Sequence, residues 1–282
     1  MEKALENLKN PPTVIEFVDE FAGNKRSNFA NKVNCLDYET ELKNFIGTTF
    51  DHVLPNDEWN SIALNYTSGT TGNPKGVVTH HRGAYLNAVS NALTWDMGEH
   101  PVYLWTLPMF HCNGWCFPWT MSAIIGTHVC LRQVRAAPIW ESLYKNKVTH
   151  LCGAPIVMST ILSASKSEKK LLENTVEFFT AAAPPPESVL TSMKAAGFNI
   201  THLYGLSETY GPAVVNEWHQ DWNQLNENDQ ASLKARQGVR YLPLESLDVM
   251  NTETMQPVPR DGKTIGEVMV RGNVVMKGYL KN

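Results

Sequence analysis

The stretch Tyr66-Thr-Ser-Gly-Thr-Thr-Gly-Asn-Pro-Lys-Gly76 carries most of the structural information in this sequence. It follows the apolar segment Ile62–Tyr66, a predicted strand, and precedes Val77-Val78 and the helix-like segment Gly83–Leu93. Glycines let the backbone turn sharply and bring successive N–H groups against an anion. Hydroxyl groups add donors, and a lysine supplies a mobile positive charge. The stretch is therefore predicted to hold phosphate groups.

Two other interpretations of this loop are a polar turn and a Walker A loop. Polar Gly/Ser-rich turns between a strand and a helix are common, but here glycines, hydroxyls and a lysine coincide at the end of an apolar strand. A Walker A loop would place Gly-Lys-Ser/Thr four residues after a glycine, and the stretch lacks that arrangement. A P-loop ATPase or kinase is therefore disfavoured.

The composition indicates a globular protein that binds small molecules. The chain has 282 residues, 43% of them hydrophobic, which is enough for a substantial core. It carries 24 basic and 28 acidic residues with no run of five like charges, so neither a nucleic-acid surface nor an acidic tail is predicted.

The cysteines and the first residues bear on the compartment. Five cysteines in a chain of this length argue for reduced thiols rather than a disulfide framework. The first thirty residues mix acids, bases and prolines, so they are predicted to form neither a signal peptide nor a membrane span. We expect a cytoplasmic, reducing environment and no transmembrane segment.

Short apolar runs alternate with helical stretches through the middle of the chain. Besides Ile62–Tyr66, the predicted strands are Val102–Leu107, Thr127–Leu131, Val148–Cys152, Phe178–Ala182 and Ile200–Tyr204. The predicted helices between them include Pro138–Asn146 and Pro186–Ala196, the latter ended by Gly197. This order predicts an α/β fold: a large, mostly parallel sheet with helices on both faces and a ligand crevice at the carboxyl ends of the strands.

The pattern changes at both ends of the chain. After Gly238 come shorter extended pieces, Leu247–Met250 and Gly266–Arg271, separated by the turn Arg260-Asp-Gly262. We predict three parts: a partial N-terminal segment at 1–55, an α/β core at 56–237, and a partial β-rich subdomain at 238–282.

The loop at 66–76 resembles the signature of the adenylate-forming, or AMP-binding, superfamily, which includes acyl-CoA synthetases, luciferases and peptide-synthetase adenylation domains. In that family the loop handles the β- and γ-phosphates of ATP. The resemblance assigns this role to Thr67, Ser68, Gly69, Thr70, Thr71 and Lys75. It also implies that the chain is a piece of the family's N-terminal domain.

A second family motif is Tyr204-Gly-Leu-Ser-Glu-Thr209. The resemblance implies that Tyr204 stacks on adenine, that Gly205 and Ser207 lie at the nucleotide, and that Glu208 reaches Mg²⁺. Taken alone, an acid near a turn is usually a solvated loop residue or a helix cap. Its place after another strand, well beyond the first loop, favours the binding role, since Mg²⁺ shares a few hard oxygen ligands with phosphates and water.

Two further segments match the family. Thr180-Ala-Ala-Ala-Pro-Pro-Pro186 resembles a small-residue turn against adenine, which implies a binding role for Ala182, Ala183 and Pro184. A proline helix start after a strand explains the prolines equally well. The blocks Gly266–Gly272 and Met276–Tyr279 match a segment that is mainly structural in relatives.

The segment Pro108-Met-Phe-His-Cys-Asn-Gly-Trp115 resembles the lining of the family's acyl tunnel. The resemblance implies that His111 gates the carboxylate and that Trp115 and Phe117 form walls. A buried histidine satisfied by backbone is the main rival for His111. A zinc site at His111, Cys112 and Cys116 is disfavoured because a fourth ligand at a usual spacing is missing.

The resemblance implies an acyl-CoA ligase that uses ATP, Mg²⁺ and CoA on a medium- or long-chain fatty acid or an aromatic acid. The segment Leu233–Tyr241 looks like the fatty-acyl and aromatic-acyl branch. Because full-length relatives are roughly twice as long, we expect the mobile C-terminal domain to be absent and ligase activity to be strongly reduced or lost. The alternative is an inactive nucleotide- or acyl-binding fragment. Exposed sheet edges predict self-association.

Overall fold

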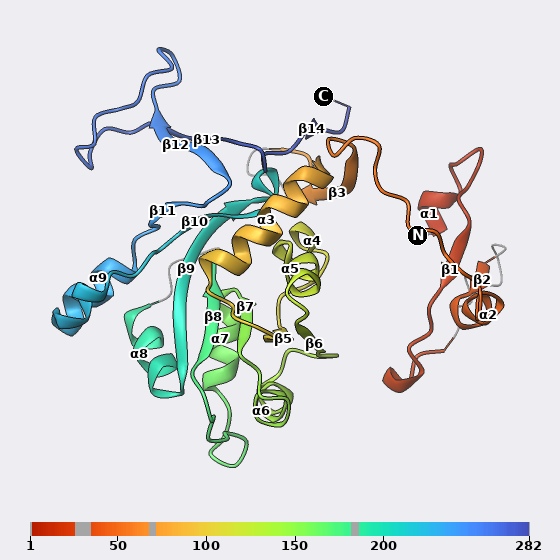
Figure 1. Ribbon diagram of the computed structural model, residues 1–282, viewed down its shortest axis with the longest axis horizontal. Coiled ribbons are helices and arrows are strands. Elements are labelled where there is room, and N and C mark those ends of the chain that lie inside the picture. The colour runs from red at the N-terminus through yellow and green to blue at the C-terminus, as the bar shows by residue number, and fades with distance from the viewer. Residues whose placement is uncertain (1, 26–34, 68–71, 182–185, 282) are drawn as a thin grey trace. The chain divides into compact units, whose positions relative to one another are not determined.

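The chain forms two units, Met1–Leu54 and Pro55–Asn282. The computed structural model describes residues 2–25, 35–67, 72–181 and 186–281 (Figure 1). Within these ranges no helix is both long enough and apolar enough to cross a bilayer. The five cysteines form no disulfide in the described part of the chain.

The first unit consists of short elements. They are α1 (Glu2–Leu5), β1 (Val14–Glu16), η1 (Glu20–Ala22), β2 (Cys35–Asp37) and α2 (Tyr38–Asn44). β1 and β2 pair in parallel. Asp37 caps α2, because its carboxylate accepts a hydrogen bond from the Thr40 backbone N–H at 2.8 Å and satisfies one of the unpaired donors of the first turn.

A seven-stranded sheet with the order β11-β10-β9-β8-β7-β5-β6 organises the second unit. Its strands are β5 (Val102–Trp105), β6 (Thr127–Cys130), β7 (His150–Gly153), β8 (Val176–Thr180), β9 (Phe198–Leu206), β10 (Gly211–Val215) and β11 (Val239–Arg240). β6, β5, β7, β8 and β9 run parallel, and β10 and β11 continue the sheet antiparallel. The predicted mostly parallel sheet is confirmed.

Helices cover both faces of this sheet (Figure 1). They are α3 (His81–Thr94), α4 (Cys112–Trp115), α5 (Phe117–Ala123), α6 (Ala136–Lys145), α7 (Pro155–Leu162), α8 (Glu187–Ala195) and α9 (Glu227–Lys234), with the 3₁₀ turns η2 (Ser207–Thr209) and η3 (Gln220–Gln224). In β8, Phe178 packs with the core under α6, α7 and α8, whereas Phe179 packs with Trp95 and α5 on the other side. Side chains alternate along a strand, so both faces are buried.

The segment Ile62–Tyr66 is a strand, as predicted, but it does not belong to the large sheet. β3 (Ser61–Thr67) pairs antiparallel with β4 (Lys75–His80), and β14 (Gly278–Tyr279) adds to β4 in a separate three-stranded sheet. The loop therefore joins the two strands of a hairpin, and the predicted helix at Gly83–Leu93 follows β4 as part of a helix over His81–Thr94. The physical reason for the hairpin is length, since a parallel return needs a crossover of roughly a dozen residues or more.

The last part of the chain forms the hairpin of β12 (Leu244–Met250) and β13 (Glu267–Gly272). Val214 of β10 and Leu244 of β12 share a small core with Val274. This core packs the hairpin against the large sheet. After β13 the chain returns to β14.

Candidate functional site

A cavity of about 650 Å³ lies at the carboxyl ends of β8 and β9, next to the β3–β4 hairpin. It collects predicted site residues from three segments of the chain. Those that line it are Thr67, Lys75, His111, Trp115, Tyr204, Gly205, Ser207 and Glu208. The tertiary structure thus brings together residues from the phosphate loop, the second motif and the predicted acyl segment.

A second cavity of about 900 Å³ lies beside the β12–β13 hairpin and shares Tyr204 with the first. It is larger, but it is lined mostly by that hairpin and by the turn at Pro257–Arg260. We place the candidate site in the smaller cavity because Lys75 and Glu208, groups suited to phosphate and to a cation, both reach it.

The hairpin places the two ends of the predicted phosphate loop opposite each other. Thr67 at the end of β3 is paired with Lys75 at the start of β4. Four predicted phosphate-binding residues between them, Ser68, Gly69, Thr70 and Thr71, lie outside the described residues. So do Ala182, Ala183 and Pro184, although Ala181 before them lines the cavity. Their roles stay predictions.

Glu208 lies in η2, within the turn that connects β9 and β10. Its carboxylate Oε1 accepts a hydrogen bond from the Tyr279 hydroxyl at 2.7 Å, and its backbone carbonyl accepts one from the Met276 N–H at 2.8 Å. Lys75 Nζ lies 4.9 Å from the centroid of the Tyr279 ring. Tyr279 therefore touches both charged groups, a function that its block was not predicted to have.

The turn between β9 and β10 is tight because Gly205 has no side chain. A Cβ at this position would lie 1.9 Å from the Gly211 carbonyl oxygen. The Thr209 hydroxyl lies 3.0 Å from that same oxygen and accepts a hydrogen bond from the Leu206 N–H at 3.0 Å. The Thr209 hydroxyl thus bridges the two ends of the turn. The turn places Ser207 and Glu208 at the cavity.

The predicted acyl segment contains an unusual backbone. Cys112, Asn113, Gly114, Trp115 and Cys116 all have φ between 43° and 65°. Each non-glycine residue in the left-handed region costs roughly 1–2 kcal/mol, so surrounding contacts must hold this turn. The Asn65 side-chain amide donates to Asn113 Oδ1 at 2.9 Å, and Cys112 Sγ lies 3.3 Å from Ser207 Oγ.

The predicted residues of this segment have different environments. His111 is exposed and lines the cavity, and Trp115 is buried with part of its surface on the cavity. Phe117 is fully buried, stacks on Tyr103 at 4.9 Å between ring centroids, and is not among the described residues that line the cavity. Its position gives no support to the predicted wall role, because the left-handed turn directs it into the core.

Two asparagines in α3 support the site from behind, and sequence analysis missed both. Asn91 donates to the Trp115 carbonyl at 2.8 Å and accepts from the Tyr241 hydroxyl at 2.7 Å. One turn earlier, Asn87 donates to the Tyr210 carbonyl at 2.8 Å. Trp115 and Tyr210 are both left-handed residues in cavity-forming turns. The spacing of four between two asparagines, which places both on one side of the helix, was the available signal.

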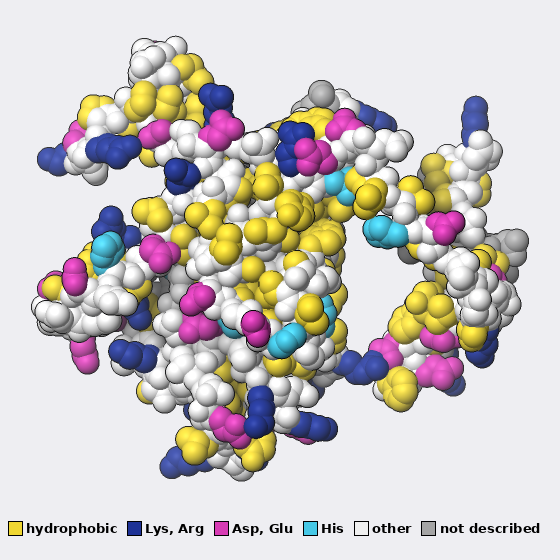
Figure 2. Space-filling model, in the orientation of Figure 1, with side chains coloured by type: hydrophobic (Ala, Val, Ile, Leu, Met, Phe, Trp, Pro, Cys, Tyr) yellow, Lys and Arg dark blue, Asp and Glu magenta, His cyan; other side chains and the backbone are white. Residues whose placement is uncertain are grey.

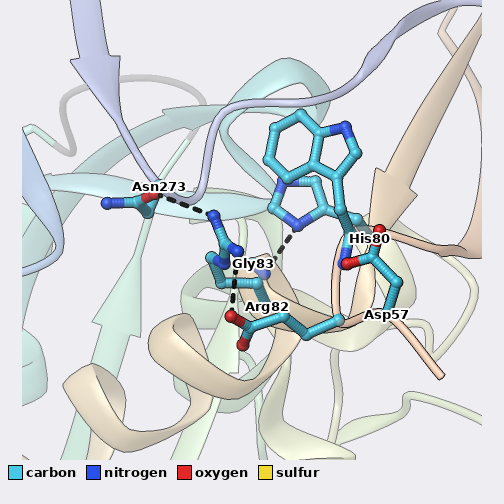
Figure 3. A network of polar contacts seen from close by, with 7 residues as sticks. Asp57, His80, Arg82, Gly83 and Asn273 are labelled. Carbon is cyan, nitrogen blue, oxygen red and sulfur yellow. Dashed lines mark hydrogen bonds and ion pairs between the residues drawn. The ribbon is translucent and has the colours of Figure 1, made fainter. Parts of the chain in front are cut away.

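A network around His80 holds the segment that precedes β14 (Figure 3). His80 Nδ1 accepts a hydrogen bond from the Gly83 N–H at 3.0 Å, so it caps α3. Its Nε2 lies 3.0 Å from the Val275 carbonyl, which only accepts, so Nε2 carries the proton. Burial lowers the pKa of His80 below 6.5. Arg82 extends the network to Glu58 at 2.8 Å.

The residues at the cavity could hold Mg²⁺ only together with a bound ligand that supplies further oxygen atoms to the ion. Among the described residues no group of three or more His, Cys, Asp or Glu side chains could hold a metal. Mg²⁺ in nucleotide sites takes one or two carboxylates and completes its shell with phosphates and water. In the described part of the chain two carboxylates, Glu208 and Glu267, line the cavity, and Glu208, which also contacts Tyr279, suits this mode of binding.

Comparison with known proteins identifies the family of the chain. The family model described as AMP-binding enzyme matches residues 2–280. The acetate/butyrate–CoA ligase AAE7 of Arabidopsis thaliana, a peroxisomal protein by its name, is 52% identical over 100% of this chain and 49% of its own length. The acetate–CoA ligase CCL3 of Humulus lupulus is 51% identical over 96% of this chain and 48% of its own length. The chain spans about half the length of the curated relatives it matches.

Solved structures show the same fold. The N-terminal domain of FACL13 from Mycobacterium tuberculosis aligns with a TM-score of 0.74 at 20% identity, covering 100% of this chain and 63% of that one. The o-succinylbenzoate–CoA synthetase MenE of Bacillus subtilis, solved with ATP and magnesium, aligns with a TM-score of 0.73 at 21% identity, covering 100% and 55%. The chain belongs to the AMP-binding enzyme family.

Proposed function

We propose that the protein of which this chain is a part is an ATP-dependent acyl-CoA ligase. In the first step a carboxylate oxygen attacks the α-phosphorus of ATP, giving an acyl-adenylate and pyrophosphate. In the second, the CoA thiol attacks the acyl carbon and AMP leaves. The observation that carries the proposal is the cavity in which Lys75, Tyr204, Glu208 and His111 converge from distant parts of the sequence.

The proposed roles follow from the chemistry of each group. Lys75 supplies a point charge to the phosphates, and the backbone N–H groups and hydroxyls of 67–71 are proposed to bind the same phosphates. Tyr204 offers a ring to adenine, which 182–184 are proposed to bind as well. Glu208 would hold Mg²⁺, which when bound neutralises charge on the phosphate oxygens. Positioning and electrostatics of this kind do most of the work in phosphoryl-type transfer.

The acid substrate is proposed by class only. The names of relatives give acetate, butyrate, benzoate and trans-cinnamate as their substrates. We propose a monocarboxylic acid, aliphatic or aromatic, whose carboxylate enters past His111 and whose body contacts Trp115. Medium- and long-chain fatty acids remain part of this proposal and belong in any substrate panel.

Two properties of the whole protein are also proposed. The apolar side chains exposed on α3, which include Tyr85 and Leu93, gather on one face (Figure 2) and support self-association. A reducing compartment is supported by the cysteines, of which Cys112, Cys116 and Cys152 are buried in the second unit.

The proposal is tested by ATP binding and by ATP–pyrophosphate exchange with a panel of carboxylates. Lys75→Ala should reduce both by roughly tenfold or more, about 1.4 kcal/mol of lost charge-assisted bonding. Lys169→Ala, an exposed lysine away from the cavity, is the matched control and should change neither.

Three results are informative. Exchange with one or more acids supports the ligase. Binding of ATP without exchange assigns the inactive nucleotide-binding alternative to this chain. Absence of ATP binding, or binding that Lys75→Ala leaves unchanged, contradicts the site.

A further inference from the structure

Tyr279 contacts two oppositely charged groups at the cavity. Its hydroxyl donates to Glu208 Oε1 at 2.7 Å, and the face of its ring lies 4.9 Å from Lys75 Nζ. A phenol offers one donor at its tip and a negative electrostatic face on its ring. In Tyr279 the hydroxyl contacts the carboxylate of Glu208, and the face of the ring contacts the ammonium group of Lys75.

The backbone of Tyr279 is anchored on both sides. Tyr279 pairs with Val77 in β4, and the following N–H, that of Leu280, donates to the Gly76 carbonyl at 2.7 Å. Before it, the Met276 N–H donates to the Glu208 carbonyl at 2.8 Å. The ring is therefore held between the hairpin that carries Lys75 and the turn that carries Glu208.

We infer that Tyr279 is a positioning residue that keeps Lys75 and Glu208 separate and oriented for a magnesium–nucleotide complex, an inference that rests on the proposed function. Lys75 and Glu208 line the same cavity, and a direct ion pair would neutralise both. The hydroxyl of Tyr279 occupies one carboxylate oxygen and leaves the second for a cation. The ring gives the ammonium a neutral partner that phosphate oxygens can displace.

The contact of the hydroxyl with Glu208 and the contact of the ring with Lys75 can be tested separately by substitution. Tyr279→Phe keeps the ring and removes the hydroxyl, so it acts on Glu208 alone. Tyr279→Leu removes both contacts. Tyr85→Phe removes the hydroxyl of an exposed tyrosine in α3 and is the control. Urea unfolding of each variant separates loss of fold from loss of positioning.

The contact itself is measured without nucleotide. Urea unfolding of Tyr279→Phe, Glu208→Gln and the double variant forms a double-mutant cycle. The two single losses of stability should not add, because both substitutions remove the same hydrogen bond. Strictly additive losses overturn the inference whatever the nucleotide does.

The consequence is measured by calorimetry with ATP, once with excess Mg²⁺ and once with EDTA. Tyr279→Phe should weaken binding roughly three- to tenfold with Mg²⁺, the range for one hydrogen bond, and leave binding in EDTA unchanged. Tyr279→Leu should weaken both, because Lys75 loses its partner as well. In the Glu208→Gln background Tyr279→Phe should have no further effect.

The outcomes distinguish the inference from the function on which it rests. If wild type binds ATP and Tyr279→Phe weakens binding equally in Mg²⁺ and EDTA, or not at all, the inference fails and the nucleotide site stands. If wild type binds no ATP while the double-mutant cycle still shows coupling between Tyr279 and Glu208, the proposed function fails, and the positioning role fails with it.

Discussion

At the scale of single residues, the cavity depends on a position where even one methyl group does not fit. Gly205 packs against the Gly211 carbonyl, where β10 turns back along β9. The strand pairing and the Thr209 hydroxyl both depend on this close approach. The turn that presents Glu208 is therefore sensitive to any side chain added at Gly205.

Gly205→Ala should lower the free energy of unfolding by about 1–3 kcal/mol or more, because the backbone must shift to admit the methyl group. Urea denaturation measures this effect. Gly72→Ala is the control, since a Cβ there meets no atom within 4 Å and should be nearly neutral. Equal stability of the two variants would show that the turn is less tight than described.

At the scale of elements, α3 acts as the support for two cavity turns. Asn87 and Asn91 bind carbonyls of the left-handed residues Tyr210 and Trp115, which have no other helix or sheet to satisfy them. Buried carbonyls need such partners, and their loss is costly. The left-handed turns thus persist because a neighbouring helix supplies donors at the correct spacing.

Asn91→Leu should cost about 1–3 kcal/mol of stability, because it leaves the Trp115 carbonyl and the Tyr241 hydroxyl without their partner. Leu93→Ala, at an exposed site in the same helix, should cost much less. Chemical denaturation compares the two. A larger loss at Leu93 would contradict the support role of Asn91.

At the scale of the whole molecule, buried histidines make stability depend on pH. Burial lowers the pKa of His80 and His202, and lowers that of His150 to about 4. The pKa of each of these histidines is lower in the folded chain than in the unfolded chain, where it is about 6.5. At pH values between the two, the unfolded chain therefore binds more protons. Their contribution is present above pH ~6.5 and is lost as pH falls through the folded values.

The free energy of unfolding should therefore decrease from pH 7.5 toward pH 5, as measured by urea titration at each pH. His80→Gln keeps a hydrogen-bonding side chain that does not titrate, so it should flatten part of this dependence. The exposed His100 gives the control His100→Gln, which should leave the slope unchanged. A wild-type curve that is flat or rises on acidification would contradict the burial of these rings.

Local sequence pattern was sufficient for the five parallel strands of the large sheet and for three helices. β5, β6, β7, β8 and β9 arise from short apolar runs, and α3, α6 and α8 fall on the predicted segments. Local pattern was not sufficient for β4, β10 and α7. For β4, nothing local distinguishes a hairpin return at Val77-Val78 from a connection that leads into a helix.

The sequence by itself determined the family, because motifs such as 66–76 and Tyr204–Thr209 are specific to it, and it predicted Lys75 and Glu208 as the charged residues of the site. Only the tertiary structure decided that β3 and β4 form a separate sheet, that Phe117 is core, and that Tyr279 stands between Lys75 and Glu208. The physical reason is that pairing across long sequence separations depends on which faces are buried together, and local composition does not encode that.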